Sequence, residues 1–169
     1  MTDVTQIKEA LVKCGISPSR PRTAILGYLR NHYTHPTADE IFRDLRESVP
    51  TLSLTTVYNT LKLFSEKGLC LSLTINEKQV CYDGHTYPHG HLLCSRCGKI
   101  HDIVQESVSA LPAEEFICGH RVTEVHYYYK GICSECLVNE NVSWQQLNDN
   151  TLLYTKHKKI RLWVRNLFV

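Results

Sequence analysis

Residues 82–102 of this chain read Tyr-Asp-Gly-His-Thr-Tyr-Pro-His-Gly-His-Leu-Leu-Cys-Ser-Arg-Cys-Gly-Lys-Ile-His-Asp. Two metal-ligand patterns overlap in this stretch: a Cys-x-x-Cys pair, and a His-x-His pair with aspartates nearby. Thiolates suit a borderline-soft metal, whereas imidazoles and carboxylates suit a harder and more exchangeable one. The stretch therefore predicts a structural metal beside a sensing or catalytic metal.

The cysteine pair, Cys94 and Cys97, has a matching pair downstream in Cys133 and Cys136. Two such pairs supply four thiolates, which is the tetrahedral set that structural zinc requires. Redox-active dithiols are the alternative, but a redox Cys-x-x-Cys motif normally occurs once, beside a βαβ pattern. We therefore favour structural zinc, with a helix and a strand between the two pairs.

The histidine pair, His89 and His91, would lie on one face of a strand, because side chains two residues apart point the same way. Asp83 and Asp102 stand on either side of the pair in the sequence. Such a set suits Fe²⁺, Mn²⁺ or Zn²⁺. The alternative is an exposed polar strand face without a metal, and these residues by themselves leave both interpretations open.

The composition describes a chain long enough for one or two small domains with cores of their own. It has 169 residues, eight cysteines and a net charge of +2. No apolar run is long enough to span a bilayer and no signal peptide opens the chain, so we expect a cytoplasmic protein without membrane contact. In that reducing compartment, cysteines favour metal binding over disulfides. The overall charge does not predict a nucleic-acid partner.

The segment before the metal motifs has the pattern of a winged helix. Helical periodicity recurs in four segments before Gly68, and a capping box at residues 37–40 opens the third. Apolar and polar residues then alternate over residues 71–75 and 80–82, which predicts a β-hairpin. Helices followed by a two-stranded wing indicate a winged helix-turn-helix domain.

The fourth predicted helix, residues 53–64, combines an apolar stripe with a polar face near its start. Hydroxyl, phenol, amide and ammonium groups are those that a recognition helix uses on base edges and phosphates. An ordinary solvated face is the alternative, but the following wing favours DNA. The candidate DNA-binding residues are Ser53, Thr55, Thr56, Tyr58, Asn59 and Lys62.

After the wing we expect a small α/β domain, with a strand at residues 100–103, a short helix at 107–118 and a strand at 121–129. The predicted fold class is therefore α+β. We place a winged-helix domain at residues 1–83, a zinc-stapled dimerisation and metal-sensing domain at 84–139, and a tail of unknown role at 140–169.

The tail mixes basic with apolar residues, so it could form a basic amphipathic helix on phosphate or membrane. A docked or disordered tail is the alternative that we favour. We assign no role to Cys70, Cys81 or Cys118.

Four sequence pieces resemble, in the same order, the ferric uptake regulator family of metal-dependent repressors. They lie within residues 5–138 and read His35-Pro-Thr-Ala-Asp-Glu-Ile41, Thr56-Val-Tyr-Asn-Thr-Leu61, His89-x-His91-x-x-Cys94-x-x-Cys97-Gly-Lys-Ile100 and Gly131-Ile-Cys133-x-x-Cys136. The resemblance implies an N-terminal winged-helix domain, a C-terminal α/β dimerisation domain, and a homodimer on a palindromic DNA operator. It implies a repressor and not an enzyme.

The resemblance also implies two metals. Structural zinc would be held by Cys94, Cys97, Cys133 and Cys136. A regulatory Fe²⁺ or Mn²⁺, with Zn²⁺ as a further candidate, would lie between the domains on His35, Asp83, His89, His91 and Asp102.

Within the family, Asp83, Asp102 and Asn59 resemble the peroxide-sensing repressors. In that branch, bound Fe²⁺ reacts with hydrogen peroxide and oxidises a ligand histidine, and the matching targets are His35 and His89. An iron- or zinc-responsive repressor of metal uptake genes is the alternative within the family. A metallo-hydrolase that uses two of the histidines and a carboxylate is the alternative from another class.

Overall fold

The structure is a computed structural model of the chain, and it describes residues 3–104, 115–122 and 124–138. These residues divide into two compact units, with the boundary between Gly131 and Ile132. None of the described helices is long and apolar enough to cross a membrane. The predicted tail at residues 140–169 lies outside the described residues.

Four helices begin the first unit, and each starts at a side chain that accepts a hydrogen bond from the backbone of its first turn. They are α1 (Val4–Lys13), α2 (Arg20–Asn31), α3 (Ala38–Leu45) and α4 (Leu54–Glu66), capped by Asp3, Ser19, Thr37 and Ser53. The predicted capping box is confirmed, because Thr37 and Glu40 each accept a hydrogen bond from the other's backbone N–H. Such a cap contributes about 1 kcal/mol.

The four helices share one apolar core. The predicted stripe of α4 is confirmed, since Val57, Leu61 and Phe64 are fully buried. They pack in the same cluster as Ile25 and Leu29 of α2. Because this stripe is buried, the polar residues on the other side of α4 face solvent.

The predicted wing is a two-stranded antiparallel hairpin, β1 (Leu71–Leu73) and β2 (Cys81–Asp83). The hairpin is tied to the loop before α3, because the Tyr82 N–H donates to the Pro36 carbonyl at 2.9 Å. This bond brings the end of β2 beside the loop that contains His35.

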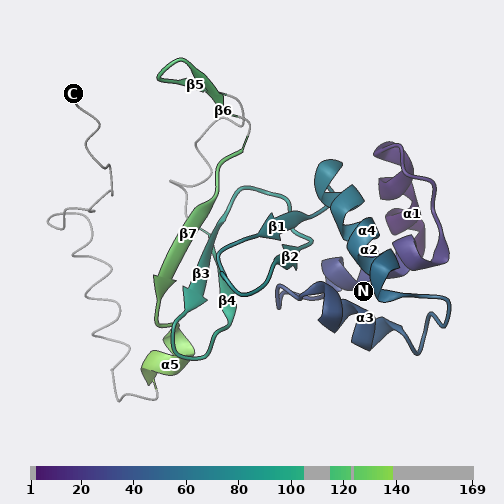
Figure 1. Ribbon diagram of the computed structural model, residues 1–169, viewed down its shortest axis with the longest axis horizontal. Helices are drawn as coiled ribbons and strands as arrows, with labels where there is room; N and C mark the ends of the chain where they lie inside the picture. The colour runs from purple at the N-terminus through teal and green to yellow at the C-terminus, as the bar shows by residue number, and fades with distance from the viewer. Residues whose placement is uncertain (1–2, 105–114, 123, 139–169) are drawn as a thin grey trace, which may run out of the picture. The chain divides into compact units, whose positions relative to one another are not determined.

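A three-stranded sheet follows, in the order β4-β3-β7: β4 (Ile100–Ile103), β3 (Gly90–Cys94) and β7 (Tyr127–Gly131). Strand β3 is antiparallel to β4 and parallel to β7. Leu73 and Cys81 of the wing pack with Ile100 of the sheet in a second small core. Figure 1 accordingly shows the wing between the helices and the sheet. The α+β class is confirmed.

Residues 115–122 differ from the prediction. The expected helix over residues 107–118 is wrong at its end, and residues 107–114 lie outside the described residues. The structure has a hairpin of β5 (Glu115–Ile117) and β6 (His120–Val122), and the expected single strand over residues 121–129 is wrong because β7 begins only at Tyr127. The hairpin turns at Cys118 and Gly119, whose φ angles are 51° and 79°. Two positive φ angles suit a two-residue hairpin turn, but cysteine is not a usual turn signal.

The second unit contributes one described helix, α5 (Ser134–Val138). Its turn forms around the second cysteine pair, because the Leu137 N–H donates to the Cys133 carbonyl at 3.0 Å.

Candidate metal centre

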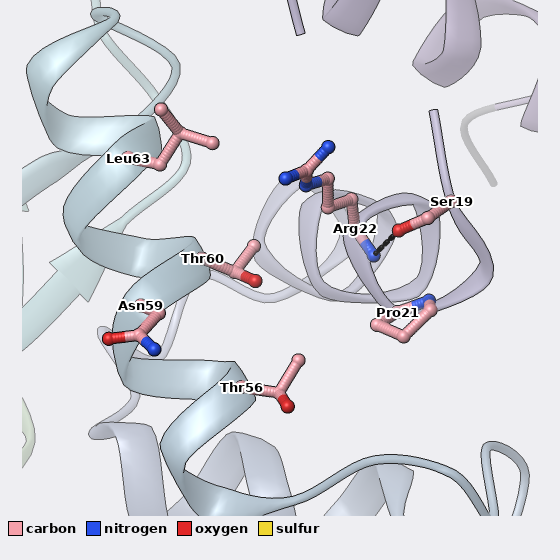
Figure 2. A pocket seen from close by; sticks show the side chains of 7 residues that line it. All are labelled: Ser19, Pro21, Arg22, Thr56, Asn59, Thr60 and Leu63. Atoms are coloured by element: carbon pink, nitrogen blue, oxygen red, sulfur yellow. Dashed lines mark hydrogen bonds between the residues drawn. The ribbon is translucent and has the colours of Figure 1, made fainter. Parts of the chain in front are cut away.

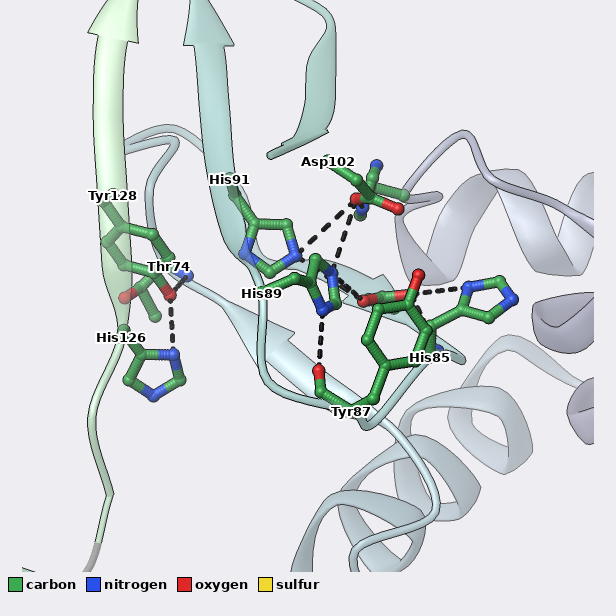
Figure 3. Close-up of polar contacts among 10 residues, drawn as sticks. Thr74, His85, Tyr87, His89, His91, Asp102, His126 and Tyr128 are labelled. Carbon is green, nitrogen blue, oxygen red and sulfur yellow. Dashed lines mark hydrogen bonds and ion pairs between the residues drawn. The ribbon is translucent and has the colours of Figure 1, made fainter. Parts of the chain in front are cut away.

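Five side chains from four separate segments of the chain converge within the first unit. Each offers one ligand atom, and all five atoms lie within 4.8 Å of one another. Figure 3 shows His89, His91 and Asp102 directed toward one another. The five are the predicted regulatory ligands His35, Asp83, His89, His91 and Asp102.

The sheet and the wing account for most of this placement. His91 on β3 lies directly opposite Asp102 on β4 in the antiparallel register. Directly opposite side chains in an antiparallel pair lie on the same face of the sheet. His89 precedes His91 by two residues, and Asp83 ends β2. Two strand pairings thus position four of the five groups.

His35 reaches the group by an unusual backbone conformation. Its φ angle is 51°, in the left-handed region, and the residue is 4% exposed. A non-glycine residue in this region costs about 1–3 kcal/mol, and such residues cluster at functional sites. The hydrogen bond between Tyr82 and the Pro36 carbonyl holds the loop in place. The fold therefore tolerates local strain to turn this imidazole inward.

The converging atoms are close but are not hydrogen-bonded. His35 Nε2 lies 2.7 Å from Asp102 Oδ1, and His89 Nε2 lies 3.0 Å from Asp83 Oδ2. Nevertheless these four buried atoms, like His91 Nε2, have no hydrogen-bond partner in the described structure. A buried polar group without a partner costs about 1–3 kcal/mol. A bound divalent cation would satisfy all five atoms at once.

The ring of His89 gives the sharpest indication of a cation. Its Nδ1 lies 2.7 Å from the Tyr87 carbonyl oxygen, which can only accept, so Nδ1 carries the hydrogen. In the neutral ring, Nε2 then presents a lone pair to Asp83 Oδ2 at 3.0 Å and to Asp102 Oδ1 at 3.5 Å. Facing lone pairs repel, unless a cation lies between them. Metal-binding histidines are usually oriented by such a bond from the other ring nitrogen.

Both carboxyl groups are charged at neutral pH. Burial raises the pKa of Asp83, but the His91 imidazole and the His85 backbone N–H outweigh it, so this pKa lies below its ordinary value of 3.8. Burial likewise raises the pKa of Asp102, and the adjacent His35 brings it below 3.8. Deprotonated carboxylates are the form that binds metal. The residues present therefore fit Fe²⁺, Mn²⁺ or Zn²⁺.

A second group that could hold a metal comprises two cysteine pairs, Cys94 with Cys97 and Cys133 with Cys136. Cys94 ends β3 and is buried, and Cys97 follows in an exposed turn. The turn closes with the Gly98 N–H donating to the Cys94 carbonyl at 2.9 Å, and Gly98 has a φ of 73°. The Cys97 N–H also donates to Cys94 Sγ at 3.5 Å. This turn suits a thiolate, because its backbone offers a donor to the sulfur.

The downstream pair has a similar local form. Cys133 precedes α5, Cys136 lies within it, and both are buried. Each Cys-x-x-Cys pair thus lies on a single turn, as zinc-binding pairs do.

The polar face of α4 is available to a partner. Thr55, Tyr58, Asn59 and Lys62 are exposed, whereas Ser53 caps the helix and bonds Thr56. The Tyr58 hydroxyl donates to Asp39 Oδ2 at 2.9 Å, which links α4 to α3.

Two contributors to this face were missed by the sequence reasoning. Ser19 and Arg22 at the start of α2 line a pocket of about 370 Å³ together with Thr56 and Asn59 of α4 (Figure 2). The Arg22 guanidinium donates to the Ser17 carbonyl at 2.8 Å. The Ser-x-x-Arg spacing of a capped helix start was the available signal.

Three cysteines that have no role assigned from the sequence lie outside the group of four, two in the core and one on the surface. Cys70 and Cys81 are buried, and burial raises the pKa of the Cys70 thiol to about 12, so it is a core group and not a nucleophile. Cys118 is exposed in the turn between β5 and β6.

Comparison with known proteins agrees with this arrangement. The sequence pattern of the Ferric uptake regulator family matches residues 13–130. The Peroxide operon regulator of Bacillus subtilis (strain 168) is 36% identical over 142 residues, which are 82% of this chain and 97% of that protein. The Helicobacter pylori ferric uptake regulator Fur has the same fold, with a TM-score of 0.61 at 19% identity over 80% of this chain and 95% of that one. The Campylobacter jejuni peroxide stress regulator gives a TM-score of 0.54 at 25% identity, over 80% of this chain and all (100%) of that one. The chain belongs to the ferric uptake regulator family.

Proposed function

We propose that this protein is a transcriptional repressor that binds DNA when a regulatory metal is bound and releases it after reaction with hydrogen peroxide. The observation that supports this most directly is the convergence of five buried nitrogen and oxygen atoms that have no hydrogen-bond partner among the described residues. The relatives named for peroxide responses support the choice of signal.

The regulatory metal would act by joining two parts of the chain. His35 belongs to the loop between α2 and α3, whereas His91 and Asp102 belong to the sheet. A metal bonded to both fixes the helices relative to the sheet. In a homodimer, that angle sets the spacing of two recognition helices on a palindromic operator. Metal binding therefore shifts the population toward the DNA-competent shape.

The four cysteines would hold a zinc ion with a purely structural role. Thiolates bind zinc tightly, and the binding free energy contributes directly to folding. Because no cysteine belongs to the set of five, the regulatory metal can exchange while the zinc stays. We place the protein in the cytoplasm, where such thiols remain reduced, and we assign it no membrane contact.

Bound Fe²⁺ would supply the electrons that activate peroxide. Overall, a ring C–H of His35 or His89 and one H₂O₂ would give the oxidised ring, which carries one added oxygen, and one water. An oxidised imidazole is a poor ligand, so the metal would leave and the DNA would be released.

DNA contacts would come from α4. Tyr58 and Asn59 would read base edges, and Ser53, Thr55, Thr56 and Lys62 would bind phosphates or bases. The exposure of Asn59 and Lys62 supports this assignment.

The test is mass spectrometry of Fe²⁺-loaded protein after low peroxide, with Mn²⁺-loaded protein as control. We expect one added oxygen on peptides containing His35 or His89, with iron alone, together with DNA release in a gel shift. Release with unmodified histidines and oxidised Cys94 or Cys97 would contradict the proposal and indicate a thiol switch. No release at all would favour the alternative, an iron- or zinc-responsive repressor. If DNA binding were the same with and without divalent metal, neither repressor interpretation would be supported, and the metallo-hydrolase interpretation would have to be tested.

A further inference from the structure

We propose that His85 is a positioning residue that limits Asp83 to one metal-binding oxygen and so keeps one coordination position of the regulatory metal open. This inference rests on the proposed function, because it concerns the same metal centre. His85 was not among the predicted ligands. His85 is not one of the five converging side chains, but it contacts one of them, Asp83.

The two oxygens of Asp83 have different surroundings. Oδ1 accepts the His85 backbone N–H at 2.8 Å and lies 3.2 Å from the His85 ring nitrogen Nδ1. Oδ2 lies 3.0 Å from His89 Nε2 and 3.5 Å from His91 Nε2, and it is buried with no hydrogen-bond partner in the part of the chain that the structure describes. Since a carboxylate oxygen can only accept, the Nδ1 that faces it serves as a donor. Two donors therefore engage Oδ1, which leaves Oδ2 for a metal.

The ring of His85 is itself held in place. It stacks on the ring of Tyr33, with centroids 4.2 Å apart and planes 11° from parallel. Tyr33 lies two residues before His35, in the same loop. The loop that delivers one metal ligand thus also supports the residue that orients a second one, Asp83.

The engagement of Oδ1 decides how many coordination positions of the metal the protein can fill. Five side chains that each bind through one atom would fill five of the six positions of an octahedron. If Oδ1 were released, Asp83 could bind through both oxygens, as carboxylates often do with hard cations. The sixth position would then be filled by protein. With Oδ1 engaged, that position is left for water or for a small oxidant.

The test uses Mn²⁺ as the probe and counts exchangeable water by the enhancement of water-proton relaxation per bound ion. His85→Phe keeps an aromatic ring to stack on Tyr33 but removes the ring donor and leaves only the backbone N–H on Oδ1, whereas His85→Gln offers an amide N–H in place of the ring donor. We expect His85→Phe to lose the bound-water enhancement without weaker Mn²⁺ binding, and His85→Gln to restore it. Tyr33→Ala should lower the enhancement through loss of the stack, and the matched control Tyr33→Phe should behave like wild type.

If His85 only supported the local structure, the Mn²⁺ affinity would change and the relaxation enhancement per bound ion would not. Loss of a supporting residue typically weakens metal binding by about 10–100-fold and would leave the enhancement per bound ion unchanged. Equal enhancement in wild type and His85→Phe would overturn the inference alone, as would a His85→Gln variant that fails to restore it. A wild-type protein that binds no Mn²⁺ would overturn both the inference and the proposed function. If His85→Phe does not fold, the Tyr33→Ala and Tyr33→Phe pair decides by the same readout.

Discussion

The two candidate ligand sets of this protein are built in opposite ways. The cysteine set consists of two local turns, each with both of its thiols within four consecutive residues. The histidine and aspartate set takes one residue each from a loop, the end of β2, the segment before β3, β3 and β4. A local pair can begin to bind metal before the chain has folded, whereas the dispersed set exists only once the fold is complete. This difference suits the first set to stabilising the fold and the second to sensing.

The chemistry of the donors follows the same division. Thiolates hold zinc tightly and need no open position in a structural site. Imidazole and carboxylate donors hold harder divalent ions that exchange more readily. Substitutions in one set at a time would show whether the cysteines stabilise the fold and the other set senses the metal.

Substitutions in the cysteine set should have the largest effect, because they should unfold part of the protein. Cys94→Ser or Cys133→Ser should lose zinc and unfold the sheet region, because structural zinc contributes about 10–16 kcal/mol in zinc-finger peptides. Thermal melts and metal analysis would measure this. A variant that keeps its zinc and melts like wild type would show that these cysteines have no structural role. Cys118→Ser, an exposed cysteine outside the set, is the matched control and should match wild type.

Replacing a residue of the histidine and aspartate set should abolish metal-dependent DNA binding without unfolding the protein. His91→Ala should lower Mn²⁺ affinity by at least about 100-fold, the upper range for loss of a mere supporting residue, and should remove metal-dependent DNA binding. Zinc content, and melting of the protein without its regulatory metal, should remain close to wild type, which metal analysis and calorimetry would check. Loss of zinc in His91→Ala would mean that the two sets are not independent. His101→Ala, on the neighbouring strand and outside the set, serves as control.

Substitutions on the proposed DNA-binding face of α4 should have a smaller effect. Asn59→Ala should lower discrimination between operator and random DNA by about 1–3 kcal/mol, because an amide can bond a base edge at two points. Lys62→Ala should weaken both kinds of DNA alike and reduce the salt slope by about 1. Titrations at several salt concentrations would separate the two. Equal losses on operator and random DNA for Asn59→Ala would exclude base reading by this residue.

The smallest effect concerns cysteines outside the metal set. The pKa of Cys70 is raised to about 12 by burial, so at pH 8 its thiol stays protonated and should not react with an alkylating reagent in the folded protein. Cys118 is exposed and should react first. Peptide mapping after brief alkylation would show the order. Early labelling of Cys70 would mean that the helical core opens readily.

Periodicity and capping chemistry predicted the helices and the wing well, because these signals are local. The capping box at Thr37 and the stripe of α4 were both found as expected. The hairpin at residues 115–122 was missed, because its turn uses Cys118 in a conformation that cysteine rarely adopts. No local rule of composition points to that turn.

Sequence patterns predicted the α+β class, the cysteine pairs and the candidates for the second ligand set, because the spacing of residue types reflects local chemistry. Only the folded structure shows that His35 turns inward with a φ of 51° and that its Nε2 lies 2.7 Å from Asp102 Oδ1. It also decided that His85 engages one oxygen of Asp83 and not the other. The physical reason is that such contacts depend on the register of strands and the path of a loop. Both are fixed by packing among residues distant in the sequence.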